Sequence, residues 1–242
     1  NYPTEFMCAL LTSEKDNTDK IVEYVKESQA MGIEILPPDI NASKLEFSVE
    51  GEHAVRFGLI GVKNIGAAAI ESILEQRAQG PFLNIFDFCK RVDLRTVNHK
   101  TIESLIRCGA FDSFGCRRSQ LMSVLDQALE SGARVQKERN VGQFSFFDMQ
   151  GGNGFKKEAE TYPDIEEWPK MKILSDEKEL LGFYITGHPL THYRVEIKEF
   201  ADYSTKDLFR ASENQEVKLI GIINHIKLTA TRRTGERMAI IK

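Results

Sequence analysis

The sequence contains no long hydrophobic run. None of its 242 residues lies in an apolar stretch long enough to cross a bilayer, so we expect no signal peptide and no membrane partner. The first residue is Asn rather than Met, and we therefore expect a piece of a longer or processed chain.

Cysteine is scarce and irregularly spaced. Cys8, Cys89, Cys108 and Cys116 form no C-x-x-C pair, which is typical of free thiols in a reducing cytoplasm. A zinc site made of His99, Cys108 and Cys116 is conceivable, but the spacing fits no common zinc pattern. We therefore predict no metal site and expect a cytoplasmic protein.

The sequence also lacks the usual signatures of catalysis. It has no acidic pair whose spacing requires a shared metal ion, and it has no Gly-rich phosphate loop apart from one near residue 65. His188 stands before Pro189 without a nucleophile or metal ligand nearby, so we predict a capping or buried structural histidine. We expect no catalytic residue and no cofactor in these residues.

Charge is distributed unevenly along a chain of globular composition. The overall net charge is −4, with 41% hydrophobic and 28% charged residues. Residues 53–120 and 217–242 carry net charges of +4 and +5, whereas 1–52 and 121–216 carry −7 and −6. Local positive charge is the footprint of a nucleic-acid partner, although two solvated faces would give the same pattern.

The central stretch is Phe57–Arg77, FGLIGVKNIGAAAIESILEQR. It predicts a short helix end, a tight turn over residues 63–66 and a second helix. Asn64 and Gly66 can adopt the positive φ that a sharp turn needs. One face of the second helix is apolar, with Ile70, Ile73 and Leu74. Free backbone N–H groups at the start of such a helix hold a phosphate.

This stretch resembles the helix-hairpin-helix of DNA-binding proteins, whose pattern is L-x-x-L-P-G-I-G. The matching residues are Leu59, Val62, Lys63, Asn64, Ile65 and Gly66. Asn64 stands in place of a glycine, and Ile70 in place of a small alanine. The resemblance implies DNA contacts by Gly61, Lys63, Asn64, Ile65 and Gly66. The alternative is an ordinary packing corner between two helices.

Around this stretch the periodicity predicts further helices and one small hairpin. We expect a helix over 3–12, with Phe6 and Leu10 facing inward and Met7 as a further candidate, and a second helix over 13–32. Residues 45–49 and 54–57 alternate as a hairpin around Gly51. Later helices are expected over 84–92, 100–107, 117–131 and 172–184. A second, degenerate hairpin is expected around Gly109, with Phe111 and Phe114 in the core.

The aromatic pentapeptide QFSFF precedes a Gly-rich linker. Exposed aromatic residues in such a segment are the mark of a docking peptide. The pentapeptide is similar to the bacterial sliding-clamp binding motif, Q-x-x-L-F. That similarity implies a polar subsite for Gln143 and an apolar pocket for Phe146 and Phe147. The alternative is that these rings pack back on the helical domain.

The last residues alternate as strands. The alternation predicts a strand over Val217–Leu228, with a bulge near Asn224, and the return strand begins over residues 238–241. The basic hairpin, with Lys227, Arg232, Arg233 and Arg237 near its tip, resembles strands one and two of an OB-fold that binds single-stranded nucleic acid. Only about two of the five strands of that fold are present.

Several stretches together closely resemble the alpha-subunit family of bacterial DNA polymerase III, the C-family replicative polymerases. They are PTEFMCALLTSEKDNTDKI, ILPPDIN, RFGLIGVKNIG, LIRCGAFDSFG, EKELLGFYITGHPL and VKLIGIINHIK. The resemblance implies a mainly α chain followed by a partial β OB-type hairpin, α+β overall. It also implies five parts. Residues 1–52 would be the end of the fingers, and 53–135 the helix-hairpin-helix domain that binds duplex. Residues 136–170 would hold the clamp-binding motif and a linker, 171–210 a helical connector, and 211–242 the start of the OB-fold.

This family places its metal-binding aspartates, and the Mg²⁺ they hold, in a palm upstream of these residues. We therefore expect part of a DNA-directed DNA polymerase that is inactive by itself. Its expected partners are template–primer duplex, the sliding clamp, other replisome subunits and, through the OB part, single-stranded DNA. Two alternatives remain, a repair-type DNA-binding module and an interaction scaffold that never contacts DNA.

Overall fold

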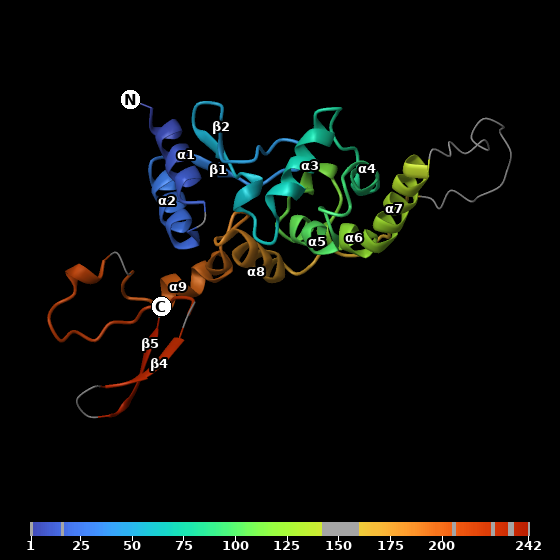
Figure 1. Ribbon diagram of the computed structural model, residues 1–242. Coiled ribbons are helices and arrows are strands. Elements are labelled where there is room, and N and C mark those ends of the chain that lie inside the picture. The colour runs from blue at the N-terminus through green and yellow to red at the C-terminus, as the bar shows by residue number, and fades with distance from the viewer. Residues whose placement is uncertain are drawn as a thin grey trace. The chain divides into compact units, whose positions relative to one another are not determined.

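The computed structural model describes residues 2–15, 17–141, 160–204, 207–223, 226–231 and 235–241. The chain divides into two compact units, Asn1–Thr186 and Gly187–Lys242 (Figure 1). Helices predominate and two small sheets accompany them, so the predicted α+β class is confirmed. The finer division into five parts stays a prediction. In the described part, no helix is both long and apolar enough to span a membrane.

The first helix follows its predicted range, whereas the second begins five residues later than predicted. α1 spans Pro3–Ser13 and α2 spans Thr18–Ala30. Asn17 begins α2, because its side chain accepts a hydrogen bond from the backbone N–H of Lys20 at 3.2 Å. Gly32, which follows α2, has a φ of +78°, a conformation that favours glycine.

The prediction that Phe6 faces the core is wrong. Phe6 is 60% exposed, whereas the neighbouring Met7 is fully buried. The buried positions of α1 recur at helical spacing, at Thr4, Met7, Cys8 and Leu11. Phe6 lies about 100° around the helix from Met7 and therefore points away from the buried stripe.

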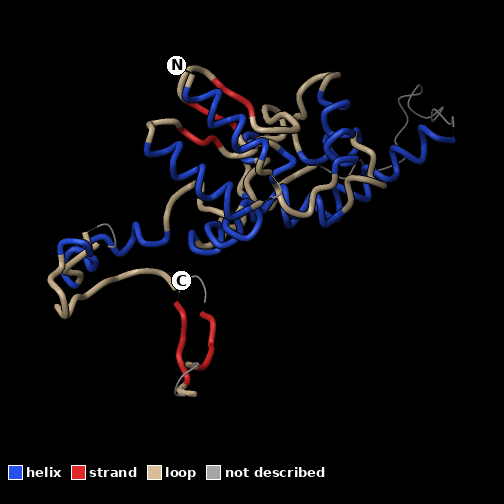
Figure 2. The backbone as a smooth tube through the Cα atoms, turned by 60° about the vertical axis from the view of Figure 1, so that its left-hand side comes forward, coloured by secondary structure: helices blue, strands red, loops and turns tan. Residues whose placement is uncertain are grey.

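A three-stranded sheet packs beside these helices (Figure 2). Its strands are β1, Glu34–Leu36, β2, Ser48–Glu50, and β3, Ala54–Arg56, in the order β1-β3-β2. The predicted hairpin is confirmed, since β2 and β3 pair antiparallel around Gly51, whose φ is +69°. The parallel pairing of β1 with β3 was not predicted.

The middle of the chain is helical. A 3₁₀ turn, η1, spans Leu59–Gly61, and the helices α3, α4 and α5 span Ala67–Arg77, Ile85–Arg91 and His99–Arg107. Asn84 and Asn98 begin α4 and α5 by accepting hydrogen bonds from Asp87 N–H at 2.8 Å and Thr101 N–H at 3.1 Å.

The helix predicted over 117–131 is interrupted. The 3₁₀ turn η2, Asp112–Phe114, is followed by α6, Arg118–Ser123, and α7, Leu125–Val141. Val124 separates the two helices, with a φ of −104° and a ψ of 3°. Gly109 and Gly115 both have positive φ and turn the chain between α5 and α6.

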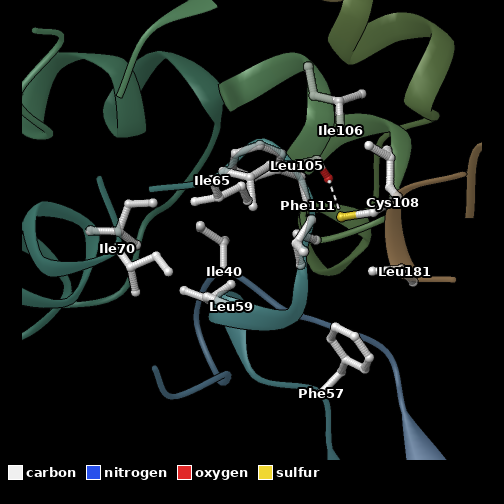
Figure 3. Close-up of a cluster of buried hydrophobic side chains, with 14 of the residues drawn as sticks. Ile40, Phe57, Leu59, Ile65, Ile70, Leu105, Ile106, Cys108, Phe111 and Leu181 are labelled. Carbon is white, nitrogen blue, oxygen red and sulfur yellow. Dashed lines mark hydrogen bonds between the residues drawn. The ribbon is translucent and has the colours of Figure 1, made fainter. Parts of the chain in front are cut away.

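One hydrophobic core unites the first unit. Figure 3 shows side chains of the central stretch, including Leu59, Ile65 and Ile70, gathered with those of α5 and with Phe111. Phe88 and Phe111 meet edge to face, with ring centroids 5.0 Å apart. The predicted core role of Phe111 is therefore confirmed, and Phe114 packs partly buried at its edge.

The segment 160–169 packs on the helical region. The side-chain amide of Gln120 donates to Pro163 O at 2.8 Å, and Arg117 donates to Ile165 O at 2.6 Å. The Glu167 carboxylate accepts from Arg118 N–H at 2.7 Å, at the start of α6. The next helix, α8, spans Lys170–Leu181, whereas the prediction was 172–184. It ends earlier than predicted because Gly182, with a φ of +91°, terminates it.

The second unit begins with short helical turns. η3 spans Pro189–Tyr193, α9 spans Arg194–Phe200 and η4 spans Leu208–Arg210. His188 caps η3, since its Nδ1 accepts from Leu190 N–H at 3.2 Å. The predicted capping role of this histidine is confirmed.

Two antiparallel strands complete the second unit, β4, Ile226–Ala230, and β5, Arg237–Ile241. The strand predicted from Val217 is wrong over 217–223, where the chain is irregular. Alternation alone predicts a strand only if a partner lies beside it, and β5 reaches only as far as Ile226 in register. The bulge predicted near Asn224 lies outside the described residues.

Candidate nucleic-acid interface

The predicted hairpin turn is present between η1 and α3. Asn64 has a φ of +68° and supplies the left-handed residue of the turn. Gly66 does not, because it is the N-cap of α3 and has the extended dihedrals of that position, φ −84° and ψ 157°. The prediction for Asn64 is confirmed, and the turn needs no positive φ at Gly66.

The start of α3 is open to solvent. Gly66, Ala67 and Ala68 are exposed, and no side chain caps the helix. Gly66 O accepts from Ala69 N–H at 3.0 Å, but within the described residues no protein group accepts from the N–H groups of Gly66, Ala67 or Ala68. A Cβ added to Gly66 would meet no atom within 4 Å, so a ligand can approach this backbone closely.

The turn is held from behind by two other helices. Lys63 N–H donates to Leu180 O at 3.0 Å, at the end of α8. The Asn64 side-chain amide donates to Ser104 Oγ at 3.3 Å, on α5. These contacts fix the backbone of the turn, while the side chains of Lys63 and Asn64 are exposed.

The five hairpin residues singled out from the sequence play different structural roles. Lys63, Asn64 and Gly66 face solvent, whereas the Ile65 side chain is buried in the core (Figure 3). Gly61 is packed, since a Cβ there would lie 2.7 Å from Cε1 of Phe57. The sequence stretch thus combines an outer surface with two packing positions.

A buried ion network holds α8 against α5 and α6. Glu177 is fully buried and accepts from Arg118 Nη2 at 3.2 Å and from Thr186 N–H at 3.0 Å. Arg118, 4% exposed, also binds Asp112 at 2.7 Å. Sequence reasoning missed this network. Arg118 and Glu177 are 59 positions apart, and only the Arg118–Asp112 pair, 6 positions apart, is local.

A second ion pair lies beside the first. Asp176 accepts from Arg107 Nη2 at 2.7 Å and from Lys172 Nζ at 2.9 Å. Burial acts to raise the pKa of Asp176, but the hydrogen bonds from Arg107 and Lys172 outweigh it, so this pKa lies below its ordinary value. The end of α8 that supports the turn is therefore firmly anchored.

The four cysteines are free thiols, as predicted. Burial raises the pKa of Cys108 to about 12, and its Sγ donates to Leu105 O at 3.4 Å. Across the residues that the structure describes, no three His, Cys, Asp or Glu side chains group together to hold a metal ion. His99 instead faces Asp126, with Nε2 3.3 Å from Oδ1.

The other predicted binding residues are placed only in part. Lys227 is exposed on β4. Gln143, Phe146, Phe147, Arg232 and Arg233 lie outside the described residues. Clamp binding and single-strand binding through these residues stay predictions.

Comparison with known proteins gives two results. A family model described as a helix-hairpin-helix motif matches residues 32–121, which include the turn, α3 and α5. The whole chain is also similar to proteins named DNA polymerase III subunit alpha. It is 34% identical to that of Vibrio cholerae over 242 residues, 36% to that of Borreliella burgdorferi over 240 and 35% to that of Escherichia coli over 242.

These alignments cover 99–100% of this chain but 21% of each relative. The chain thus spans about a fifth of the length of the curated relatives that it matches.

Proposed function

Because this chain is homologous over its whole length to one segment of the alpha subunit of bacterial DNA polymerase III, we propose that it grips template–primer duplex for a replicative polymerase. The helix-hairpin-helix match over residues 32–121 supports this proposal. The synthesis itself, DNA-directed addition of nucleotides, belongs to a palm with its Mg²⁺ outside these residues. By itself the chain is expected to be inactive.

The observation that carries the proposal is the open start of α3. A helix N-terminus carries roughly half a positive charge and offers unpaired N–H donors, which together bind a phosphate. Gly66, Ala67 and Ala68 present such donors, and no Cβ shields the first of them. Phosphate contacts carry no base information, which suits a protein that must hold every sequence.

Each residue of the turn has its own task in this proposal. Lys63 adds a mobile positive charge beside the phosphate, and Asn64 provides the left-handed bend that aims the amides. Ile65 anchors the turn in the core, and Gly61 lets Phe57 pack beneath it.

The test is the salt dependence of duplex affinity. Gly66→Val places a side chain where the phosphate approaches, yet nothing in the protein obstructs it, so the variant should stay folded and bind duplex more weakly. Lys63→Gln should lower the slope of log affinity against log salt by about 1.

The control is Lys15→Gln, which removes one positive charge from the residues between α1 and α2, where Lys15 pairs with Glu46 at 3.6 Å, and it should change affinity little. If both hairpin variants bind like this control, the turn is not the phosphate grip. A chain that binds no duplex at any salt concentration would favour the scaffold alternative.

We also propose that Gln143, Phe146 and Phe147 tether the polymerase to its sliding clamp. The support is the pentapeptide itself and its place between α7, which ends at Val141, and the packed segment that begins at residue 160. Tethering raises the local concentration of the enzyme on DNA by orders of magnitude without new DNA contacts.

The tether is tested by binding to a purified bacterial sliding clamp. Phe146→Ala with Phe147→Ala should abolish binding and leave the melting temperature unchanged. A lowered melting temperature would mean that the two rings are core residues. Absence of clamp binding by the unchanged chain, with duplex binding retained, would favour the repair-type module.

The second unit is proposed to contribute single-strand binding through Lys227, Arg232 and Arg233, by its likeness to the first strands of an OB-fold. Other replisome subunits are proposed as further partners, and the cytoplasm as the site of action. Affinity for an oligo(dT) strand, lowered by substitution of these three cations with Gln, tests the OB part.

A further inference from the structure

We propose that the chain from Asp93 to Ser104 forms a second wall of the duplex grip, in which Arg95 and Lys100 bind backbone phosphodiesters next to the one at the start of α3. The inference rests on the proposed duplex grip and deepens it. Both side chains lie outside the stretch Phe57–Arg77 that contains the hairpin residues named above.

Three hydrogen bonds hold this part of the chain alongside the hairpin. Asp93 N–H donates to Ser72 Oγ on α3 at 2.9 Å. Thr101 Oγ1 donates to Asn64 O at 3.5 Å, and the Asn64 side-chain amide donates to Ser104 Oγ at 3.3 Å. The two segments therefore run side by side in opposite directions, with Asp93 beside α3 and Thr101 beside the turn.

The position of Arg95 follows from this arrangement. Along its own segment, Arg95 lies between the contact with Ser72 and the contact with Asn64, and Ala68 lies between the same two contacts on the hairpin. Ala68 and Arg95 accordingly line one cavity of about 860 Å³, together with Thr96. Because the Ala68 amide is one of the donors proposed to hold a phosphate, Arg95 lies beside that site.

The Arg95 guanidinium is held in place before DNA arrives. Its side chain is 90% exposed, yet the Asp93 carboxylate accepts from Nε at 3.0 Å and from Nη2 at 2.9 Å. Nη1 takes no part in that pair, and a guanidinium has enough N–H groups to bind a carboxylate and a phosphate together. A side chain placed in advance loses less conformational entropy on binding than a free surface arginine does.

Lys100 supplies the net positive charge of the wall, because Asp93 offsets the charge of Arg95. Lys100 is exposed near the start of α5 and lies one helical turn before Ser104, so the two side chains share a face. Since Ser104 contacts Asn64, this face is the one beside the turn. The acid of α5, Glu103, pairs with Arg107 and leaves the Lys100 charge uncompensated on that helix.

Acidic side chains mark where the wall ends. Glu71 and Glu75 of α3 are exposed and line the same cavity as Arg95. Carboxylates repel a phosphodiester, so the DNA backbone would stay on the side of Arg95 and Lys100 and would not enter that cavity.

The test is the salt dependence of affinity for a labelled blunt-ended duplex, measured for the double variant Arg95→Gln with Lys100→Gln. The slope of log affinity against log salt should fall by about 2, since each phosphate contact contributes roughly 0.9. Both side chains are exposed, so the variant should keep the melting temperature of the unchanged chain.

The matched control is Arg117→Gln with Lys15→Gln, which removes one arginine and one lysine elsewhere. Arg118, the neighbour of Arg117, donates to the carbonyl of the last residue of α5 at 3.0 Å. Arg117 therefore lies near the opposite end of α5 from Lys100. The slope of this control should equal that of the unchanged chain.

Further variants separate the outcomes. Arg95→Lys with Lys100→Arg keeps both charges and should keep the slope; a slope as low as that of the Gln variant would contradict the charge contacts. If the Gln variant behaves like its control while Gly66→Val weakens binding, this inference is overturned and the duplex grip stands. If Gly66→Val and Lys63→Gln also bind like their control, both are wrong.

Discussion

Replacement of Glu177 by Gln tests how the turn is supported. The Oε2 atom of Glu177 accepts from Ile185 N–H at 3.1 Å and Thr186 N–H at 3.0 Å. The Oε1 atom accepts from both terminal nitrogens of Arg118, at 3.3 and 3.2 Å, and from Thr186 Oγ1 at 2.8 Å. A glutamine has the same shape, but only one of its two terminal atoms can accept.

The cost follows from these contacts. If the amide oxygen faces Arg118, the amide nitrogen faces two partly buried backbone donors, and each unsatisfied donor costs up to about 1–3 kcal/mol. The opposite orientation leaves the buried Arg118 with Asp112 as its carboxylate partner. Breaking a buried ion pair from one side costs about 3–5 kcal/mol. We expect Glu177→Gln to lower the free energy of unfolding by about 3–4 kcal/mol.

The assay is urea unfolding at pH 7, followed by circular dichroism. Glu179→Gln is the control, because Glu179 is two residues along the same helix and pairs with Arg107 from an exposed position. Exposed pairs contribute about 0–1 kcal/mol, so this variant should be nearly as stable as the unchanged chain. If Glu177→Gln costs no more than Glu179→Gln, the buried network does not anchor α8 and the reasoning is refuted.

Three further predictions address packing and pH. Gly58→Ala should lower the free energy of unfolding by about 1–3 kcal/mol, since its Cβ would overlap the backbone of Glu46. Gly66→Ala, whose Cβ would meet no atom, should cost less than about 1 kcal/mol, and urea unfolding of the two variants checks this difference. Met7→Ala should cost about 2–5 kcal/mol and Phe6→Ala almost nothing, in the same assay. In the folded chain the pKa of Asp176 lies below its ordinary value of 3.8, so the ionised carboxylate stabilises the fold above pH 3.8. That stabilisation is lost as the pH falls through the folded pKa. Asp176→Asn should therefore make the free energy of unfolding fall less steeply below about pH 4.

Local chemistry made much of the hairpin predictable from the sequence. Asn64 is among the few residues that adopt the left-handed region readily, and its φ of +68° follows from that preference. The spacing of Ile70 and Ile73 gave the buried face of α3. Asn84 gave the start of α4 through its capping side chain.

Long-range contacts were not predictable in the same way. Arg118 and Glu177 are 59 positions apart, and nothing in the local pattern distinguishes them from exposed charges. Arg107 and Asp176, 69 positions apart, form a similar pair. Phe6 was predicted to face inward because it is hydrophobic, but its position around α1 directs it away from the buried stripe. The irregular residues 217–223 show that alternation needs a neighbouring strand.

The most direct test of the duplex grip is the backbone amide spectrum of Gly66, Ala67 and Ala68. Each amide proton resonance can be followed by heteronuclear NMR while duplex DNA is added to the isotope-labelled chain at low salt. Hydrogen bonding to a phosphate should shift these three resonances downfield, more than those of amides already bonded within α3. If duplex binds and other resonances move while these three stay fixed, the start of α3 does not hold the DNA backbone and the central claim is contradicted.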